Sequence, residues 1–150
     1  MRPSACREPA MSVGQAKRAA GDAIVARARA LVGTRFRLQG RCRSNGMDCV
    51  GAAAAAGGVD AALVRRDYPL RGTSLEELER ELIRLGLQAV GEEAAEPGDI
   101  AVFAPGPAQL HLGVFTGSSL VHADAGLGRV VERPLPPPWP LLGFWRFGGR

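Results

Sequence analysis

Residues 44–58, SNGMDCVGAAAAAGG, place one cysteine between an aspartate and a run of alanines. Alanine is the strongest helix former, so the run predicts a helix that the glycines at 57 and 58 end. Aspartate is favoured at a helix N-cap, which puts Cys49 in the first turn, where free backbone N–H groups and the helix dipole favour a thiolate. The charge of Asp48 opposes this, so a cation is expected nearby. The stretch predicts a nucleophile, and a small buried hydrophobic residue is the alternative.

Two further helices flank this stretch. Residues 13–32 place apolar side chains on one face and are followed by Gly33, which suits the position after a helix C-terminus. In residues 73–86, TSLEELERELIRLG, Thr73 as N-cap and Glu76 three residues later form a capping box. The buried stripe of that helix is expected to consist of Leu75, Leu78, Leu82 and Leu85.

After residue 86 the apolar period changes to two. Five short strands are predicted, separated by turns rich in glycine and proline: 99–104, 110–116, 119–124, 129–135 and 141–147. Helices followed by strands indicate an α+β fold with an antiparallel sheet packed against helices. The segment 134–140, PLPPPWP, is expected to be irregular or an edge connection, because proline cannot donate to a strand ladder.

The only two histidines of the chain fall in this strand region. If residues 116–119 form an even-numbered turn, paired residues sum to 235, so that His111 and His122 share one sheet face as diagonal neighbours. Gly113 beside His111 leaves room for an approaching group. This arrangement suits a base and its orienting partner, with Asp124, directly across from His111, as the other candidate for the second role. A surface or satisfied core histidine is the alternative for each ring taken singly.

Length and composition limit the function. The 150 residues suggest one domain over residues 13–150 after a loose tail at 1–12. The net charge of +4 is spread along the chain and aromatic residues make up 5%, so no base-stacking platform for nucleic acid is evident, whereas a polyanionic cell-wall surface remains open. No apolar run is long enough to span a bilayer. The N-terminus lacks the apolar middle of a secretory signal, which predicts synthesis in the cytoplasm without signal-directed export.

The cysteine count and spacing argue against two other uses of Cys49. Three cysteines are an odd number, which disfavours a disulfide framework, and a Cys42–Cys49 bridge would close only a short loop. Neither CxxC nor HxxxH spacing occurs, so no metal site is expected. Nothing in the sequence indicates a cofactor.

Four stretches resemble one family in the same order along the chain: LVGTRFRLQGR with GMDCVGAAAA, EPGDIAVF, HLGVFTGSSLVHA and GRVVERPL. They are similar to the NlpC-type cell-wall peptidases, which are papain-like cysteine hydrolases, over about residues 20–147. The resemblance implies N-terminal helices packed on a five- to six-stranded antiparallel sheet. FRLQGR, DCVG and RDYPL look most like the branch found in phage tails and phage-derived gene transfer agents.

The resemblance also implies roles for individual residues. Cys49 matches the family nucleophile, His111 the base and His122 the third polar residue, while Asp48 matches the aspartate before the nucleophile. Many members carry tyrosine where this chain has Phe36, which cannot donate a hydrogen bond to an oxyanion.

The implied activity is hydrolysis of peptidoglycan stem peptides, commonly between D-glutamate and the diamino acid. Arginines on the loop before Cys49 are candidates to meet the substrate's carboxylates, or are solvated loop charges: Arg35, Arg37, Arg41 and Arg43. Two other interpretations stay open. One is a catalytically weak structural or adaptor component of a phage-like tail, and the other is an amidase or acyltransferase on the same scaffold.

Overall fold

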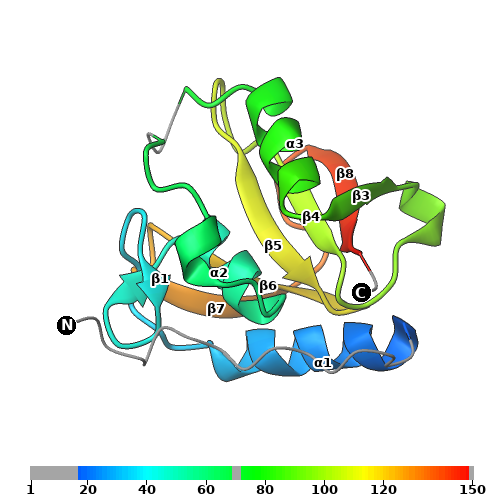
Figure 1. Ribbon diagram of the computed structural model, residues 1–150, viewed down its shortest axis with the longest axis horizontal. Coiled ribbons are helices and arrows are strands. Elements are labelled where there is room, and N and C mark those ends of the chain that lie inside the picture. Colours follow the sequence, from blue (N-terminus) through cyan, green and yellow to red (C-terminus); the bar gives the residue numbers. More distant parts are fainter. Residues whose placement is uncertain (1–16, 69–71, 149–150) are drawn as a thin grey trace.

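The computed structural model describes residues 17–68 and 72–148. It contains three α-helices and a six-stranded sheet, which confirms the α+β prediction (Figure 1). The helices are α1 (Lys17–Ala30), α2 (Cys49–Ala56) and α3 (Leu75–Arg84). The sheet is antiparallel throughout, in the order β3-β8-β4-β5-β6-β7. Its strands are β3 (Leu87–Val90), β4 (Ile100–Phe103), β5 (His111–Phe115), β6 (Ser119–Asp124), β7 (Arg129–Pro134) and β8 (Leu141–Phe147).

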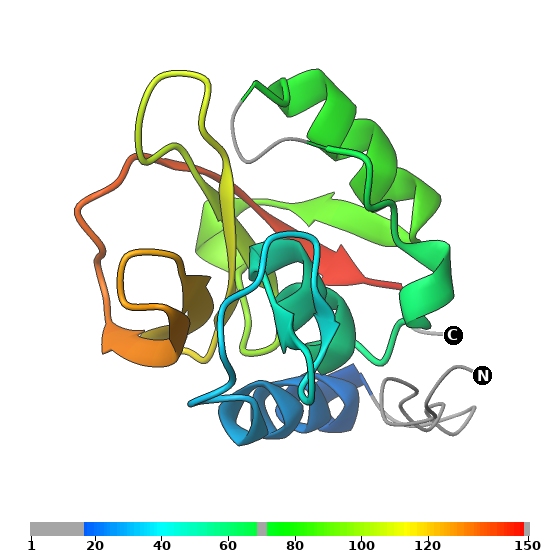
Figure 2. The same cartoon turned by 90° about the vertical axis from the view of Figure 1, so that its left-hand side faces the viewer.

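Smaller elements complete the fold. A two-stranded hairpin of β1 (Arg41–Cys42) and β2 (Gly46–Met47) precedes α2, and two 3₁₀ turns, η2 (Ala61–Leu63) and η3 (Glu92–Ala94), lie on connections. Figure 2 shows α2 lying above α1, with the β1–β2 hairpin beside it. The helix α2 packs against α1, β1, β5 and β6, so α1, the hairpin and the sheet surround the residues that follow Cys49.

The core lies on both faces of the sheet. In β4, Ile100 and Val102 belong to the main cluster beneath the helices, whereas Ala101 and Phe103 belong to a second cluster on the opposite face. This alternation is the period of two expected of a strand. Alanines of α2 contribute to the main cluster, and their small side chains allow the helix to lie close to the sheet.

The register of the β5–β6 hairpin is the predicted one. Phe115 pairs with Leu120 and Val114 with Val121, so that paired residues sum to 235. The ladder does not extend to the expected pair of His111 and Asp124. On the other edge of β5, His111 pairs with Phe103 of β4.

The capping of α3 differs from the prediction by one residue. Ser74, not Thr73, is the N-cap: it accepts a hydrogen bond from the backbone N–H of Glu77 (3.1 Å), whose carboxylate accepts from the Ser74 N–H (3.0 Å). Both TSLE and SLEE fit the capping-box pattern, and the second places Leu78 and Leu82 in the core. Leu75 is 37% exposed, so the expected stripe begins one turn later.

The strand predictions were confirmed but incomplete. The predicted strands were all found, within one residue at either end, but β3 and the β1–β2 hairpin were missed. The structure ends β7 at Pro134 on the sheet edge and leaves 135–140 outside the strands, as predicted. The predicted tail at 1–12 lies outside the described residues. None of the helices within 17–68 and 72–148 is long and apolar enough to cross a bilayer.

Candidate active site

The first turn of α2 holds Cys49 as predicted. Asp48 is the N-cap, with φ −98° and ψ −171°, and its Oδ1 accepts a hydrogen bond from the backbone N–H of Gly51 (2.9 Å). A side chain at Gly51 would collide with the backbone oxygen of Gly40, because a Cβ there would lie 2.1 Å from that atom. The glycine therefore lets the loop before the hairpin lie directly against the helix that carries the cysteine.

Asp48 is the centre of a buried hydrogen-bond network. Besides the Gly51 N–H, its carboxylate accepts bonds from Nη1 of Arg41 (3.0 Å), the backbone N–H of Gln39 (2.7 Å) and the hydroxyl of Tyr68 (2.6 Å). The side chains of Arg41 and Asp48 are only 1% and 3% exposed. Both charges are thus paired away from water, which is the condition under which buried ions are tolerated.

Arg41 also ties the segment before α3 to this network. Its guanidinium donates to the hydroxyl of Tyr68 (2.7 Å) and to the backbone carbonyls of Gly40 and Arg65. Neither interpretation offered for Arg41, a substrate contact or a solvated loop charge, describes this residue. Its role is the cation expected beside Asp48, and no sequence signal linked it to Tyr68, because that contact spans 27 residues of chain.

The two histidines lie together on one face of the sheet. Nε2 of His111 and Nδ1 of His122 are 2.7 Å apart, and the rings are perpendicular with centroids 4.8 Å apart. This bond occupies the Nε2 edge of His111 and leaves its Nδ1 available to another group. His122 is 1% exposed, and its own Nε2 is buried without a hydrogen-bond partner within residues 17–68 and 72–148.

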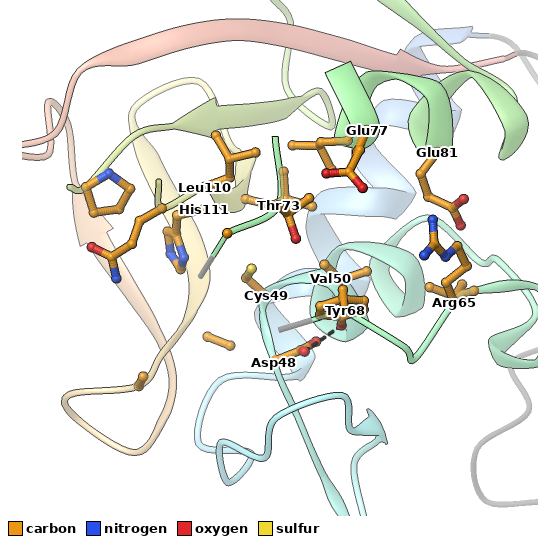
Figure 3. Close-up of a pocket in the computed structure, with 18 of the residues that line it drawn as sticks. Asp48, Cys49, Val50, Arg65, Tyr68, Thr73, Glu77, Glu81, Leu110 and His111 are labelled. Atoms are coloured by element: carbon orange, nitrogen blue, oxygen red, sulfur yellow. Dashed lines mark hydrogen bonds between the residues drawn. The ribbon is translucent and has the colours of Figure 1, made fainter. Parts of the chain in front are cut away.

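Cys49 and His111 open onto the same pocket, a cavity of about 240 Å³. In Figure 3, His111 and Leu110 lie at one end, Glu81 and Arg65 at the other, and the Cys49 sulfur points into the space between them. Phe36 also lines this pocket. A partly enclosed cleft with one thiol and one imidazole on its wall is the arrangement a covalent hydrolase needs.

Burial and Asp48 govern the ionisation of Cys49, in contrast to the sequence-based expectation. Burial first, and the Asp48 charge second, raise the pKa of the Cys49 thiol from 9.0 to about 12. Hydrogen bonds from the backbone at Leu112 and Val50 and the charge of Arg41 act in the opposite direction but are outweighed. The expectation of a resting thiolate at the helix N-terminus is therefore wrong, since desolvation exceeds the contribution of the helix end.

The histidines are shifted toward their neutral forms. Burial, and next the neighbouring His122, lower the pKa of His111 from 6.5 to about 3. The pKa of His122 is also lowered, chiefly by burial. The charge of Asp124 opposes the shift at both rings and that of Arg133 adds to it. These shifts favour a thiol and two uncharged imidazoles in the site at neutral pH.

The remaining predicted residues take other places. Asp124 accepts a hydrogen bond from the backbone N–H of Leu127 (2.9 Å) and so closes the turn after β6, while His122 forms the bond to His111. Cys49 is a free thiol, which excludes a Cys42–Cys49 bridge. Cys42 is disulfide-bonded. The odd cysteine count had disfavoured disulfides, but three cysteines can still form one disulfide and leave one free thiol. Across the described ranges, no three His, Cys, Asp or Glu side chains are grouped as a metal site would require.

Sequence reasoning missed two residues around the site. Tyr68 lines the pocket and reaches Asp48 through its hydroxyl. Trp139 packs against both histidines, with ring centroids 5.1 Å from His111 and 5.4 Å from His122. The tryptophan comes from the proline-rich connection, where no periodic pattern indicates which way a side chain points.

Comparison with solved structures identifies the fold. The peptidoglycan hydrolase RipB from Mycobacterium tuberculosis superimposes with a TM-score of 0.59 and 22% identity, covering 97% of this chain and 71% of that one. NlpC1 from Trichomonas vaginalis gives a TM-score of 0.60 and 17% identity over 89% of this chain and 45% of its own. RipD from M. tuberculosis, a non-catalytic NlpC/p60 domain protein adapted to peptidoglycan binding, gives 0.55 and 16% over 85% and 95%.

These similarities define the class of the fold, the papain-like NlpC/P60 domain, as the sequence resemblance implied. No family model matches the sequence, and no curated protein does. Because one of the similar structures is non-catalytic, the fold alone does not assign an activity.

Proposed function

We propose that the protein is a cysteine peptidase that cleaves peptide bonds in peptidoglycan stem peptides, with Cys49 as nucleophile, His111 as base and His122 as the residue that orients the base. The observation that carries the proposal is the His111–His122 hydrogen bond beside a pocket that also contains the Cys49 thiol. A purely structural domain of this fold needs neither the paired rings nor the cleft.

The hydrogen bond between the two histidines supports one route for the proton. For His111 to accept a proton at Nδ1, its Nε2 must carry a hydrogen and donate it to Nδ1 of His122. His122 then fixes the tautomer and the ring orientation of His111, which is the part that the third member plays in other triads.

The reaction begins with an uncharged pair, because the pKa of Cys49 is raised and that of His111 is lowered. As the sulfur attacks the peptide carbonyl carbon, the thiol proton passes to Nδ1 of His111. The backbone N–H of Cys49, at the start of α2, stabilises the oxyanion. His111 next gives the proton to the leaving amine, and a thioester remains on Cys49. Water then attacks the thioester, its proton passes through His111 back to sulfur, and a carboxylic acid leaves.

The assignment of the substrate rests on the fold and on the RipB similarity. The bond we propose is that between D-glutamate and the diamino acid. The resemblance of FRLQGR, DCVG and RDYPL to sequences from phage tails and gene transfer agents supports a phage-like particle as the carrier of the protein to the cell wall.

The test is digestion of purified peptidoglycan and of defined muropeptides, followed by mass spectrometry of the products. The wild-type protein is expected to release fragments cut within the stem peptide, and Cys49→Ala to release none while keeping its fold. Fragments cut between sugar and peptide would indicate an amidase instead. Equal release by wild type and Cys49→Ala would reject Cys49 as the nucleophile.

A non-catalytic binding or tail-adaptor role is the second candidate, and two observations favour it. RipD shows that this fold also occurs in a non-catalytic peptidoglycan-binding protein. In addition, Phe36 lines the pocket without a hydroxyl to offer an oxyanion. Co-sedimentation with insoluble peptidoglycan, with no fragments released by the wild type, would support this role over hydrolysis.

A further inference from the structure

Trp139 stands behind the histidine pair, outside the pocket. Its ring is close to perpendicular to both imidazoles, at 74° to His111 and 84° to His122. The three ring centroids form a nearly equilateral triangle with sides of 4.8, 5.1 and 5.4 Å. Edge-to-face contacts at these separations are attractive and directional, so each ring restricts the rotation of the other two.

Trp139 is itself held in place from two other sides. The ring of Phe103, in the second core cluster, lies 5.8 Å away at 66°. The guanidinium carbon of Arg133 lies over the indole, 5.1 Å from its centroid, an arrangement typical of a cation–π contact. The indole thus joins β4, β7 and the proline-rich connection to the histidine pair.

The histidine pair has few hydrogen bonds to hold it. The single bond between the rings uses one nitrogen of each, and the remaining nitrogen of His122 has no hydrogen-bond partner in the described part of the chain. An imidazole restrained by one bond can still rotate about its Cβ–Cγ axis. Packing must therefore supply the orientation that a third hydrogen-bond partner supplies elsewhere, and Trp139 is the aromatic ring that contacts both imidazoles.

We propose that Trp139 is a positioning residue for the reaction: with Arg133 over its ring, it fixes both imidazoles so that the His111–His122 bond stays aligned on Cys49. The inference rests on the proposed function only for its kinetic consequence. Trp139 does not line the pocket that contains the Cys49 thiol, so it acts through the histidines that it contacts.

The charged groups around the two histidines determine how removal of the Trp139 side chain would change their pKa values. Asp124 on β6 favours the protonated imidazoles, Arg133 on β7 disfavours them, and Cys49 on α2 is uncharged at neutral pH. Burial is the largest cause of the lowered pKa at both histidines. Removing the indole admits water to the pair and frees Arg133 from its place, so the pKa of each ring is expected to move up toward 6.5.

The experiment compares Trp139→Leu and Trp139→Phe with Trp145→Phe as the matched control. Trp145 is the other tryptophan, buried in the main cluster on β8, and makes no ring contact with either histidine. Trp139→Leu is expected to lower kcat by roughly 10- to 100-fold with little change in KM, since misalignment of a catalytic group costs rate more than binding. The acid limb of the pH profile of kcat should move to higher pH in Trp139→Leu. Trp139→Phe keeps an aromatic ring and is expected to recover part of the rate, while Trp145→Phe should retain the wild-type profile.

A substrate-free measurement separates this proposal from the proposed function. Nitrogen-15 NMR titration of the imidazoles is expected to show, in wild type and in Trp145→Phe, His111 uncharged down to pH 5 and His122 with a pKa below its ordinary value of 6.5. In Trp139→Leu, or in Trp139→Phe if the first variant does not fold, at least one ring should titrate at higher pH than in wild type. Wild-type titration curves in a folded Trp139→Leu protein would overturn the proposal, and so would equal kinetic losses for Leu and Phe. Absence of hydrolysis in wild type would reject the peptidase function and leave the NMR test intact.

Discussion

The buried carboxylate of Asp48 allows a sharp prediction, because one substitution should weaken the fold and make Cys49 more reactive. Asp48→Asn keeps the size of the side chain and its ability to cap α2, since asparagine is as good an N-cap as aspartate. The substitution removes the charge that faces Arg41, whose side chain is 1% exposed. Breaking a buried ion pair from one side costs about 3–5 kcal/mol, because the remaining charge is left without its counterion.

Urea unfolding measures this cost. A domain of this size has a free energy of unfolding of about 5–15 kcal/mol, so Asp48→Asn should stay folded at low urea with a much lower midpoint. Adding Arg41→Met to that variant removes the stranded charge and should restore part of the loss, since neutral replacements of buried pairs are often tolerated. A loss below about 0.5 kcal/mol in Asp48→Asn, or simple additivity of the two substitutions, would refute the account of the pair.

Asp48→Asn should also make the Cys49 thiol more reactive, although it makes the fold less stable. The Asp48 charge is the second cause of the raised pKa of Cys49, and Arg41 lowers it. In Asp48→Asn the charge of Arg41, which favours the thiolate, remains without the opposing charge of Asp48, so the pKa of Cys49 is expected to fall. The rate of Cys49 alkylation by iodoacetamide, followed by peptide mass mapping between pH 7 and 10, should rise at lower pH than in wild type. An unchanged rate profile would mean that Asp48 does not act on the sulfur.

The remaining predictions concern the base, the pocket and the caps. His122→Ala should keep a measurable remnant of hydrolysis, because orientation is a smaller contribution than the base, whereas Asp124→Ala should stay near wild type; the reverse order in muropeptide assays would exchange their roles. Phe36→Tyr supplies a hydroxyl to the pocket wall and should raise kcat if that hydroxyl reaches the oxyanion, with unchanged kcat as the contrary result. Ser74→Ala removes the cap of α3 and should cost about 1 kcal/mol in urea, without effect on kcat. Below pH 6.5 the unfolded chain binds a proton that His111 in the fold does not, because its folded pKa is about 3, so stability should fall by about 2 kcal/mol between pH 6.5 and 5. Urea midpoints measured between pH 6.5 and 5 should fall in wild type and fall less in His111→Asn. An equal fall in both proteins would mean that a group other than His111 causes the loss of stability.

Local patterns were enough to predict the frame of the site. The aspartate before a run of alanines placed Cys49 at the start of α2, and the short turn at 116–119 set the register that puts both histidines on one face. These features depend on residues close together in sequence, where capping and alternation are direct physical signals.

The features that the sequence did not reveal depend on contacts between distant segments. The partnership of Arg41 with Tyr68 spans 27 residues, and Trp139 reaches the histidines from a connection without periodicity. The neutral resting state was also missed, because the helix end can be inferred from sequence whereas the depth of burial around Cys49 cannot.

Formation of a thioester on Cys49 tests the central claim most directly. Wild-type protein would be mixed with a defined stem peptide, quenched in acid on the millisecond-to-second scale, and weighed intact by mass spectrometry. The account predicts a transient mass increase equal to the acyl half of the peptide, mapped to Cys49, absent from Cys49→Ala and strongly reduced in His111→Ala. Turnover of the peptide by Cys49→Ala at the wild-type rate, or an acyl group mapped to any other residue, would contradict it.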